Sequence, residues 1–183
     1  ISRSDNNGLN WINFTTTNGL GSNDIRDMYI ENNTIYAATS GGVSVSYNDG
    51  LSWTNFTISN GLGNNSVQKV YYLNNIIYAA TDNGLSISSN NGSNWINYNK
   101  YDGLAGNKII NVYAKNNKAY ALTDVGFYVS DDNGKNWTYE ESYNKIRDFT
   151  VIKTETKVFP RLTLYNLSNN SSETYGRSIM VSY

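Results

Sequence analysis

The octet SYNDGLSW at Ser46–Trp53 occurs four times, in variant forms, in this chain of 183 residues. The other copies read SDNNGLNW at Ser4–Trp11, SSNNGSNW at Ser88–Trp95 and SDDNGKNW at Ser130–Trp137. The tryptophans that end the copies are evenly spaced along the chain and define a 42-residue period. A fixed period of this size indicates repeated structural units that stack on their neighbours.

The segments between the octets repeat in the same register. They read NGLGSNDIRDMYIENNTIYAATSGGVSVS from Asn18, NGLGNNSVQKVYYLNNIIYAATDNGLSIS from Asn60 and DGLAGNKIINVYAKNNKAYALTDVGFYVS from Asp102. Short runs of β-branched and aromatic residues, bounded by Gly or Asn, are typical of strands. In the first unit we expect strands at Ile25–Ile30, Ile35–Thr39, Val43–Ser46 and Trp53–Ile58. Four strands per unit predict an all-β fold, a β-propeller with about four four-stranded antiparallel blades.

The repeats divide a single domain, residues 1–183, into five parts. The tail contains NKIRDFTV at Asn144–Val151, which echoes NDIRDMYI at Asn23–Ile30, then one or two strands around Pro160 and a last strand at Arg177–Tyr183. The tail either caps the array or closes a four-bladed ring by pairing with the N-terminal segment; an open arc, or one completed by a second chain, is the alternative. The parts are the outer strands of a split blade at 1–17, full repeats at 18–59, 60–101 and 102–143, and a divergent segment at 144–183.

Each octet has the composition of a tight turn. The Asn or Asp at its third position can accept hydrogen bonds from amides within the turn, and the Gly suits a left-handed backbone. The Trp can pack back across the turn and bury a large apolar area. We therefore expect a structural role for Ser4, Asn6, Gly8, Trp11, Ser46, Asn48, Gly50, Trp53, Ser88, Asn90, Gly92, Trp95, Ser130, Asp132, Gly134 and Trp137.

The octets resemble the Asp-box (BNR repeat) of bacterial sialidases and related propellers, S-x-D/N-x-G-x-x-W. That resemblance implies a structural hairpin that carries no chemistry. The stretch from Asn18 to about Ser130 also resembles the two-component regulator propeller repeat, although the third strands, such as Val43–Ser46, carry small side chains where that family has aromatic ones. This second resemblance implies an extracellular sensor domain or a secreted protein.

The composition excludes several classes of function. Charged residues make up 16% of the chain and the net charge is −1, which argues against binding of nucleic acid or anionic membranes. The chain has no apolar run long enough to span a bilayer, so we expect no membrane insertion. It has neither Cys nor His, the usual metal ligands besides carboxylates, so we expect no cofactor and no metal. Because it begins with Ile and has no visible signal peptide, we expect a processed or excised chain.

Catalysis by a sialidase-like mechanism is not expected. The resemblance would require an arginine cluster, but only Arg26 and Arg147 occupy equivalent blade positions. The adjacent acidic pairs Asp131-Asp132 and Glu140-Glu141 are expected in exposed turns, where they suit solvated surface charge better than glycoside hydrolysis. We therefore expect that the protein is not an enzyme.

A binding site is expected on the face opposite the octets. There, the connectors between blades and the turns after the second strands would present amides and carboxylates beside a tyrosine-rich wall, which suits sugars or peptides. Alternatively, the three asparagines cap their own loops. The candidate ligand-binding residues are Asn23, Asn65, Asn107, Asp82, Asp124 and Lys108.

Two classes of function follow from the sequence. The first is a non-catalytic recognition or scaffold module, outside the cell or in the periplasm, that binds a protein or glycan and belongs to a larger surface or sensor protein or to a homo-oligomer. The second is a carbohydrate-binding or degenerate glycosidase-like domain.

Overall fold

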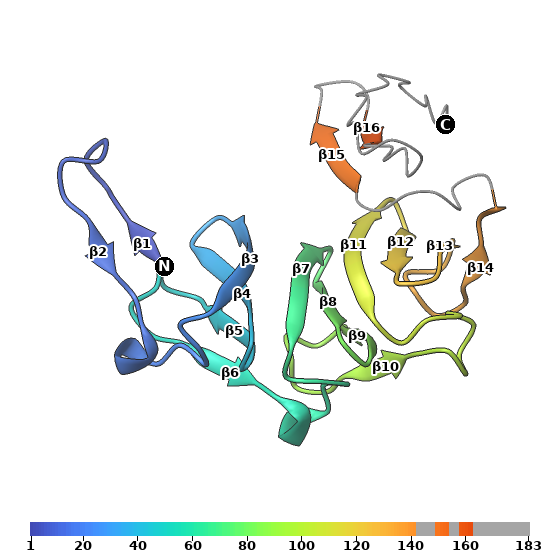
Figure 1. The fold of residues 1–183 in the computed structure, drawn as a ribbon. Coiled ribbons are helices and arrows are strands. Elements are labelled where there is room, and N and C mark those ends of the chain that lie inside the picture. The colour runs from blue at the N-terminus through green and yellow to red at the C-terminus, as the bar shows by residue number, and fades with distance from the viewer. Residues whose placement is uncertain (142–148, 154–157, 163–183) are drawn as a thin grey trace, which may run out of the picture.

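The computed structural model describes residues 1–141, 149–153 and 158–162. Within them, the chain forms three complete four-stranded antiparallel sheets and two hairpins (Figure 1). The first blade consists of β3 (Ile25–Glu31), β4 (Thr34–Thr39), β5 (Gly42–Ser46) and β6 (Thr54–Phe56). The second consists of β7 (Val67–Leu73), β8 (Ile76–Thr81), β9 (Gly84–Ser88) and β10 (Ile96–Tyr98). The third consists of β11 (Ile109–Lys115), β12 (Lys118–Thr123), β13 (Phe127–Ser130) and β14 (Thr138–Tyr139).

Each blade is a meander in which consecutive strands pair, and the first strands of neighbouring blades, β3, β7 and β11, pack against one another. The register repeats with the sequence period. Tyr36 lies opposite Tyr29 in the first blade, as Tyr78 lies opposite Tyr71 in the second. A bulge near the start of the first strand recurs in all three blades. The predicted β-propeller architecture with four-stranded antiparallel blades is therefore confirmed.

The core consists of side chains packed between adjacent blades. Between the first and second blades, Val43, Val45 and Phe56 meet Val67, Val70 and Ile77, all of them buried. Between the second and third blades, Leu85 and Tyr78 meet Ile109 and Val112. Burial of one such aliphatic side chain contributes about 1.5–3 kcal/mol, so the stacking of blades stabilises each of them.

The octet turns share one hydrogen-bond pattern. Ser46 Oγ accepts from Gly50 N at 2.8 Å, and Asn48 Oδ1 accepts from Ser52 N at 2.9 Å. Equivalent bonds recur in the other three octets. Asp49 and Gly50 both have a left-handed backbone, with φ of 57° and 91°, which explains the Asn, Asp and Gly at these positions.

The tryptophans of the octets differ in burial. Trp95 and Trp137 are buried and Trp53 is half-buried, whereas Trp11 is 60% exposed. Trp95 packs on Phe56 of the preceding blade, with ring centroids 5.8 Å apart. No equivalent ring precedes Trp11 in the described residues, so its indole stays in contact with solvent.

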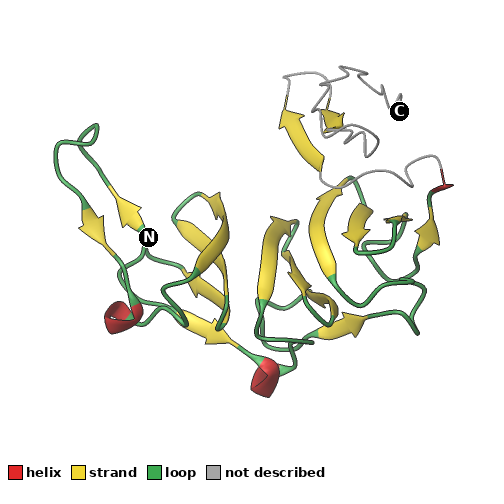
Figure 2. Ribbon diagram, viewed as in Figure 1, coloured by secondary structure: helices red, strands yellow, loops and turns green. Residues whose placement is uncertain are grey.

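The fourth strand of the blade is shorter than predicted. The expected strand Trp53–Ile58 is extended only over β6 and then turns into a short helix, η2 (Ile58–Asn60), which repeats η1 (Thr16–Asn18; Figure 2). Thr57 ends the strand because it caps this helix: its Oγ1 accepts from Ser59 N, while Asn60 Oδ1 accepts from Thr57 N.

Two hairpins flank the complete blades. The N-terminal hairpin consists of β1 (Ser2–Arg3) and β2 (Ile12–Asn13), and the C-terminal hairpin of β15 (Phe149–Lys153) and β16 (Val158–Leu162), which contains Pro160. In the register of the repeats, β1 and β2 match the third and fourth strands of a blade, because they precede β5 and β6 by one full period.

The ring closure considered from sequence does not form within the described residues. β1 pairs with β2 and β15 pairs with β16, and the two hairpins lie at opposite ends of an open arc (Figure 1). The predicted strand at Arg177–Tyr183 lies outside the described residues.

Candidate functional site

Backbone hydrogen bonds divide the loops between two faces of the arc. The connector before each blade bonds to the turn after its second strand, as in Asp82 N to Ser66 O at 3.1 Å and Asp124 N to Lys108 O at 3.0 Å. At the other ends of the strands, the octet bonds to the first turn of its blade, as in Asp49 N to Asn33 O at 3.0 Å. We call the face that carries the connectors the connector face. It contains the connectors 18–24, 60–66 and 102–108 and the turns 40–42, 82–84 and 124–126.

The three candidate asparagines of the connector face hold the connectors in place. Asn23 Oδ1 accepts from Thr16 N at 2.9 Å, and Asn65 Oδ1 accepts from Ile58 N at 2.8 Å. Asn107 Oδ1 accepts from Lys100 N at 3.2 Å. In each repeat the amide oxygen therefore bonds to the backbone seven residues earlier, which favours the loop-capping alternative for these side chains.

Polar side chains from all three blades meet on the connector face. Arg26 Nη1 donates to Ser66 Oγ at 2.6 Å, and Ser66 Oγ donates in turn to Asp82 Oδ2 at 2.5 Å. Lys108 Nζ lies 3.7 Å from Asp82 Oδ1. Arg26 comes from the first blade, Ser66 and Asp82 from the second, and Lys108 from the start of the third. We call these four residues the charged row.

The charged row remains in contact with solvent. The side chains of Arg26, Asp82 and Lys108 are 28%, 34% and 53% exposed. Burial alone would raise the pKa of Asp82, but hydrogen bonds from Ser66 and Gln68 and the positive charge of Lys108 outweigh it, so that the pKa lies below the ordinary value of 3.8. Asp82 therefore presents a stable negative charge between two cations.

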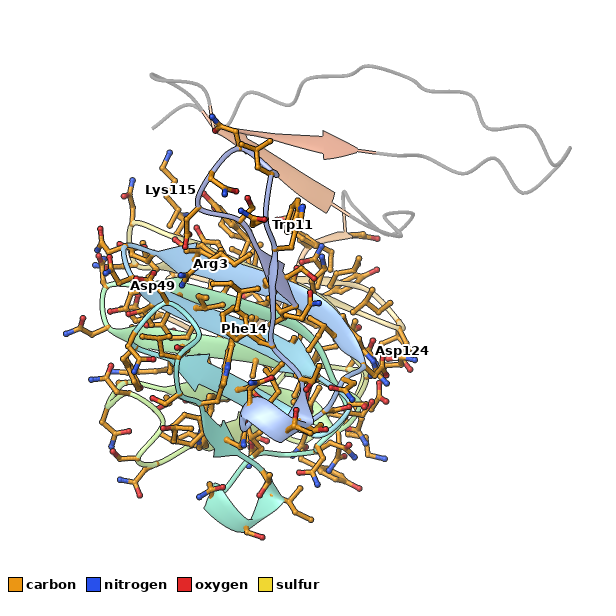
Figure 3. All side chains as sticks on the ribbon, turned by 90° about the vertical axis from the view of Figure 1, so that its left-hand side faces the viewer. Arg3, Trp11, Phe14, Asp49, Lys115 and Asp124 are labelled. Carbon is orange, nitrogen blue, oxygen red and sulfur yellow. The ribbon has the colours of Figure 1, made fainter. Side chains whose placement is uncertain are left out.

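Asp124 lies beside the row rather than in it. Its side chain is exposed at the turn between β12 and β13, and it forms no ion pair within the described part of the chain (Figure 3). The backbone of Gly106 approaches its carboxylate so closely that a Cβ at residue 106 would collide with it. Of the six predicted residues, the structure thus brings together Asp82 and Lys108.

Sequence reasoning missed Arg26, Ser66 and Gln68 as members of this cluster. Ser66 and Lys108 occupy equivalent positions in successive repeats, as do Arg26 and Gln68. One feature of the sequence does indicate this cluster. The last residue of the connector differs between the repeats, as Asp24, Ser66 and Lys108, whereas the residues at core positions are similar in all repeats.

Tyrosines form a second feature along the same inner strands. The rings of Tyr29 and Tyr71 lie 4.9 Å apart, edge to face, and those of Tyr71 and Tyr113 repeat this contact at 4.9 Å. All three side chains are partly exposed. Burial raises the pKa of Tyr29 and of Tyr71 to about 12, so both hydroxyls stay neutral at physiological pH.

The acidic pair Asp131-Asp132 is engaged in structural contacts. Asp131 lies 2.7 Å from Lys118 Nζ. Asp132 accepts hydrogen bonds from the side chain and backbone of Asn136 and from Ser130, which hold its pKa well below the usual range. Among the described residues, no group of three or more acidic side chains is placed to hold a metal ion, and no helix is long and apolar enough to cross a bilayer.

Comparison with known proteins identifies similar folds. The extracellular domain of BT4673, a one-component system protein of B. thetaiotaomicron, has a TM-score of 0.62 at 14% identity, covering 90% of this chain and 25% of that one. YCF48 bound to a D1 peptide has a TM-score of 0.55 at 17% identity, with coverages of 80% and 52%. An ancestral GH74 enzyme has a TM-score of 0.57 at 22% identity, with coverages of 75% and 21%.

No protein-family model matches the chain, and no curated protein sequence matches it either. The chain spans between about a fifth and about half of the length of the three structures above. At these identities the likeness concerns the fold alone. The chain is therefore similar in fold to propeller-type proteins of several different activities.

Proposed function

We propose that this chain is a non-catalytic recognition module of an extracellular or periplasmic protein, built from Asp-box-type repeats, and that it binds its partner on the connector face. The observation that carries the proposal is the charged row, in which Arg26, Asp82 and Lys108 from three successive blades are linked and still exposed. A ligand that bridges blades would contact fixed charges of both signs.

Peptides suit this arrangement better than other ligands. The backbone of a peptide carries donors and acceptors, and its side chains carry charges that pair with the alternating signs of the row. The tyrosines on the same inner strands supply rigid amphipathic contact area. Among the similar folds, YCF48 was solved with a D1 peptide bound, and the domain of BT4673 is the extracellular domain of a one-component system; both fit a recognition role.

The second candidate is a carbohydrate-binding or degenerate glycosidase-like domain. The fold shared with a GH74 enzyme and the partly exposed rings of Tyr29, Tyr71 and Tyr113 favour it, since sugars pack on aromatic faces and hydrogen-bond to carboxylates and amides. Asp131 and Asp132 are engaged in structural contacts, which argues against a role for these two carboxylates in glycoside hydrolysis.

Parallel binding assays separate the two candidates. The soluble protein is applied to a glycan array and to a peptide array that includes sequences with alternating charge. We expect saturable binding to peptides that weakens as salt is added, because the row is charged and exposed. Selective binding to glycans without peptide binding would favour the second candidate, and binding to neither would contradict both.

A further inference from the structure

The N-terminal hairpin occupies the position of a blade but supplies only its outer half. Arg3 of β1 donates to the backbone oxygen of Asp49 and lies over the ring of Phe14, 5.9 Å from its centroid (Figure 3). Phe14 is buried against Trp53, at the position that Phe56 and Trp95 occupy one repeat later. The hairpin therefore docks on the first blade as each complete blade docks on the next.

Within the described residues, no inner pair of strands packs on the outer face of β3, which is left uncovered. Met28 and Ile30 are 44% and 59% exposed. One repeat later the equivalent of Met28 is Val70, which is 3% exposed, and the next is Val112, which is 4% exposed. The inner strands of the preceding blade cover those positions, so the exposed face of β3 is shaped for an inner pair of strands.

The C-terminal hairpin has the character of such an inner pair. The echo of NDIRDMYI in NKIRDFTV aligns Phe149 with Met28. Phe149 pairs with Leu162 in the ladder, as Met28 pairs with Ala37. β15 and β16 thus correspond to the first and second strands of a blade, but they lie at the far end of the arc from β1 and β2 (Figure 1).

We propose that a second copy of this chain supplies the inner half of this blade, and that its β15 and β16 complete the blade with β1 and β2. The two halves are complementary in strand position, and each has an unpaired edge within the described residues. Reciprocal exchange between two copies makes two composite blades, which with three complete blades per chain gives an eight-bladed ring. This pairing also removes exposed sheet edges.

The register of the composite blade follows from the repeats. Ser2 is the equivalent of Ser44 one period earlier, and Ser44 pairs with Ala37. Since Leu162 corresponds to Ala37, Ser2 of one copy is expected opposite Leu162 of the other. The chain has no cysteine, so engineered pairs report this contact without background.

Disulfide trapping between two variants tests the proposal. Full-length Ser2→Cys and Leu162→Cys proteins, one of them carrying a mass tag, are mixed and oxidised. We expect a disulfide-linked dimer that contains one copy of each variant, and mass spectrometry of the linked peptides identifies the bond. A mixture that stays unlinked, or a Ser2→Cys/Leu162→Cys double variant that forms its disulfide within a monomer, overturns the proposal.

The oligomeric state provides a second readout that leaves the ladder residues intact. Light scattering during gel filtration should give twice the chain mass for the wild type and for Ile58→Asp, which alters a 59% exposed isoleucine on η2. Ile30→Asp, at an equally exposed isoleucine, should shift the protein to the monomer because it places a charge in the buried composite interface. A monomeric wild type, or equal behaviour of the two variants, contradicts the exchange between copies.

Discussion

Phe14 packs edge to face on Trp53 with ring centroids 6.3 Å apart, and one repeat later Phe56 and Trp95 make the same contact at 5.8 Å. The contact joins the last strand of one blade to the octet of the next. The tryptophan of the octet therefore packs against the neighbouring blade as well as against its own turn. Both contacts account for its recurrence in every repeat.

Replacing this tryptophan should therefore lower the free energy of unfolding only where a preceding blade covers the indole ring. Trp95→Ala is expected to lower the free energy of unfolding by about 3–5 kcal/mol, because Trp95 is 8% exposed. In the monomeric Ile30→Asp background, Trp11→Ala, at a 60% exposed tryptophan, should change it by no more than about 0.5 kcal/mol. Chemical denaturation followed by tyrosine fluorescence measures both. Equal losses would mean that the tryptophans act within their own turns.

The serine that begins each octet should be required for the turn. Ser88 is buried, and its Oγ accepts from Gly92 N at 2.8 Å. Ser88→Ala leaves this amide without its partner and is expected to cost about 1–3 kcal/mol of unfolding free energy. Ser93→Ala, five residues later on the exposed surface of the same turn, is the matched control. A stability loss in Ser93→Ala that equals the loss in Ser88→Ala would refute this role.

The hydroxyl of Tyr78 is expected to destabilise the fold. Its side chain is fully buried, and its Oη has no hydrogen-bond partner within the described residues. Tyr78→Phe should raise the free energy of unfolding by about 1 kcal/mol, since it removes an unsatisfied polar group. Tyr72→Phe should lower it, because Tyr72 Oη donates to Asn75 Oδ1 at 2.9 Å. Destabilisation of both variants would show that the Tyr78 hydroxyl has a partner.

The same residue predicts a dependence on alkaline pH. Burial raises the pKa of Tyr78 from 10.0 to about 12 in the folded protein. Between these values the unfolded chain loses the phenol proton while the folded chain keeps it, so stability is fully present below pH 10 and falls as pH rises toward 12. Tyr78→Phe should make this decline shallower in denaturation curves recorded across that range. An unchanged slope would contradict the raised pKa.

The sequence predicted the blades well because their determinants are local. The octet turns and the strands between them can each be predicted from residues that lie a few positions apart. Because the period is constant, the prediction for one repeat applies to the other repeats. The helix η2 was missed because its signal is the pair Thr57 and Asn60, a capping box with no apolar periodicity. So short a helix leaves no helical pattern of apolar residues.

The candidate site was harder to predict because it depends on contacts between blades. Asp82 and Lys108 were identified from their place in the loops, but their link through Ser66 to Arg26 depends on how neighbouring blades pack. The three asparagines recur because they make the same structural contact: each accepts a hydrogen bond from the backbone N–H seven residues earlier, just before its connector. Side chains that change between repeats, such as Ser66 and Lys108, form the distinctive surface.

The central claim is that the charged row on the connector face binds the partner, and two lysine variants test it directly. Lys108 pairs with Asp82 on that face, whereas Lys118 pairs with Asp131 at the octet end of the third blade. Binding of array-selected peptides is measured by calorimetry for wild type, Lys108→Ala and Lys118→Ala. Lys108→Ala should weaken binding by at least about tenfold, since a hydrogen bond to a charged group contributes about 1.5–3 kcal/mol, and Lys118→Ala should leave it unchanged. Loss of binding in Lys118→Ala with full binding in Lys108→Ala would contradict the claim.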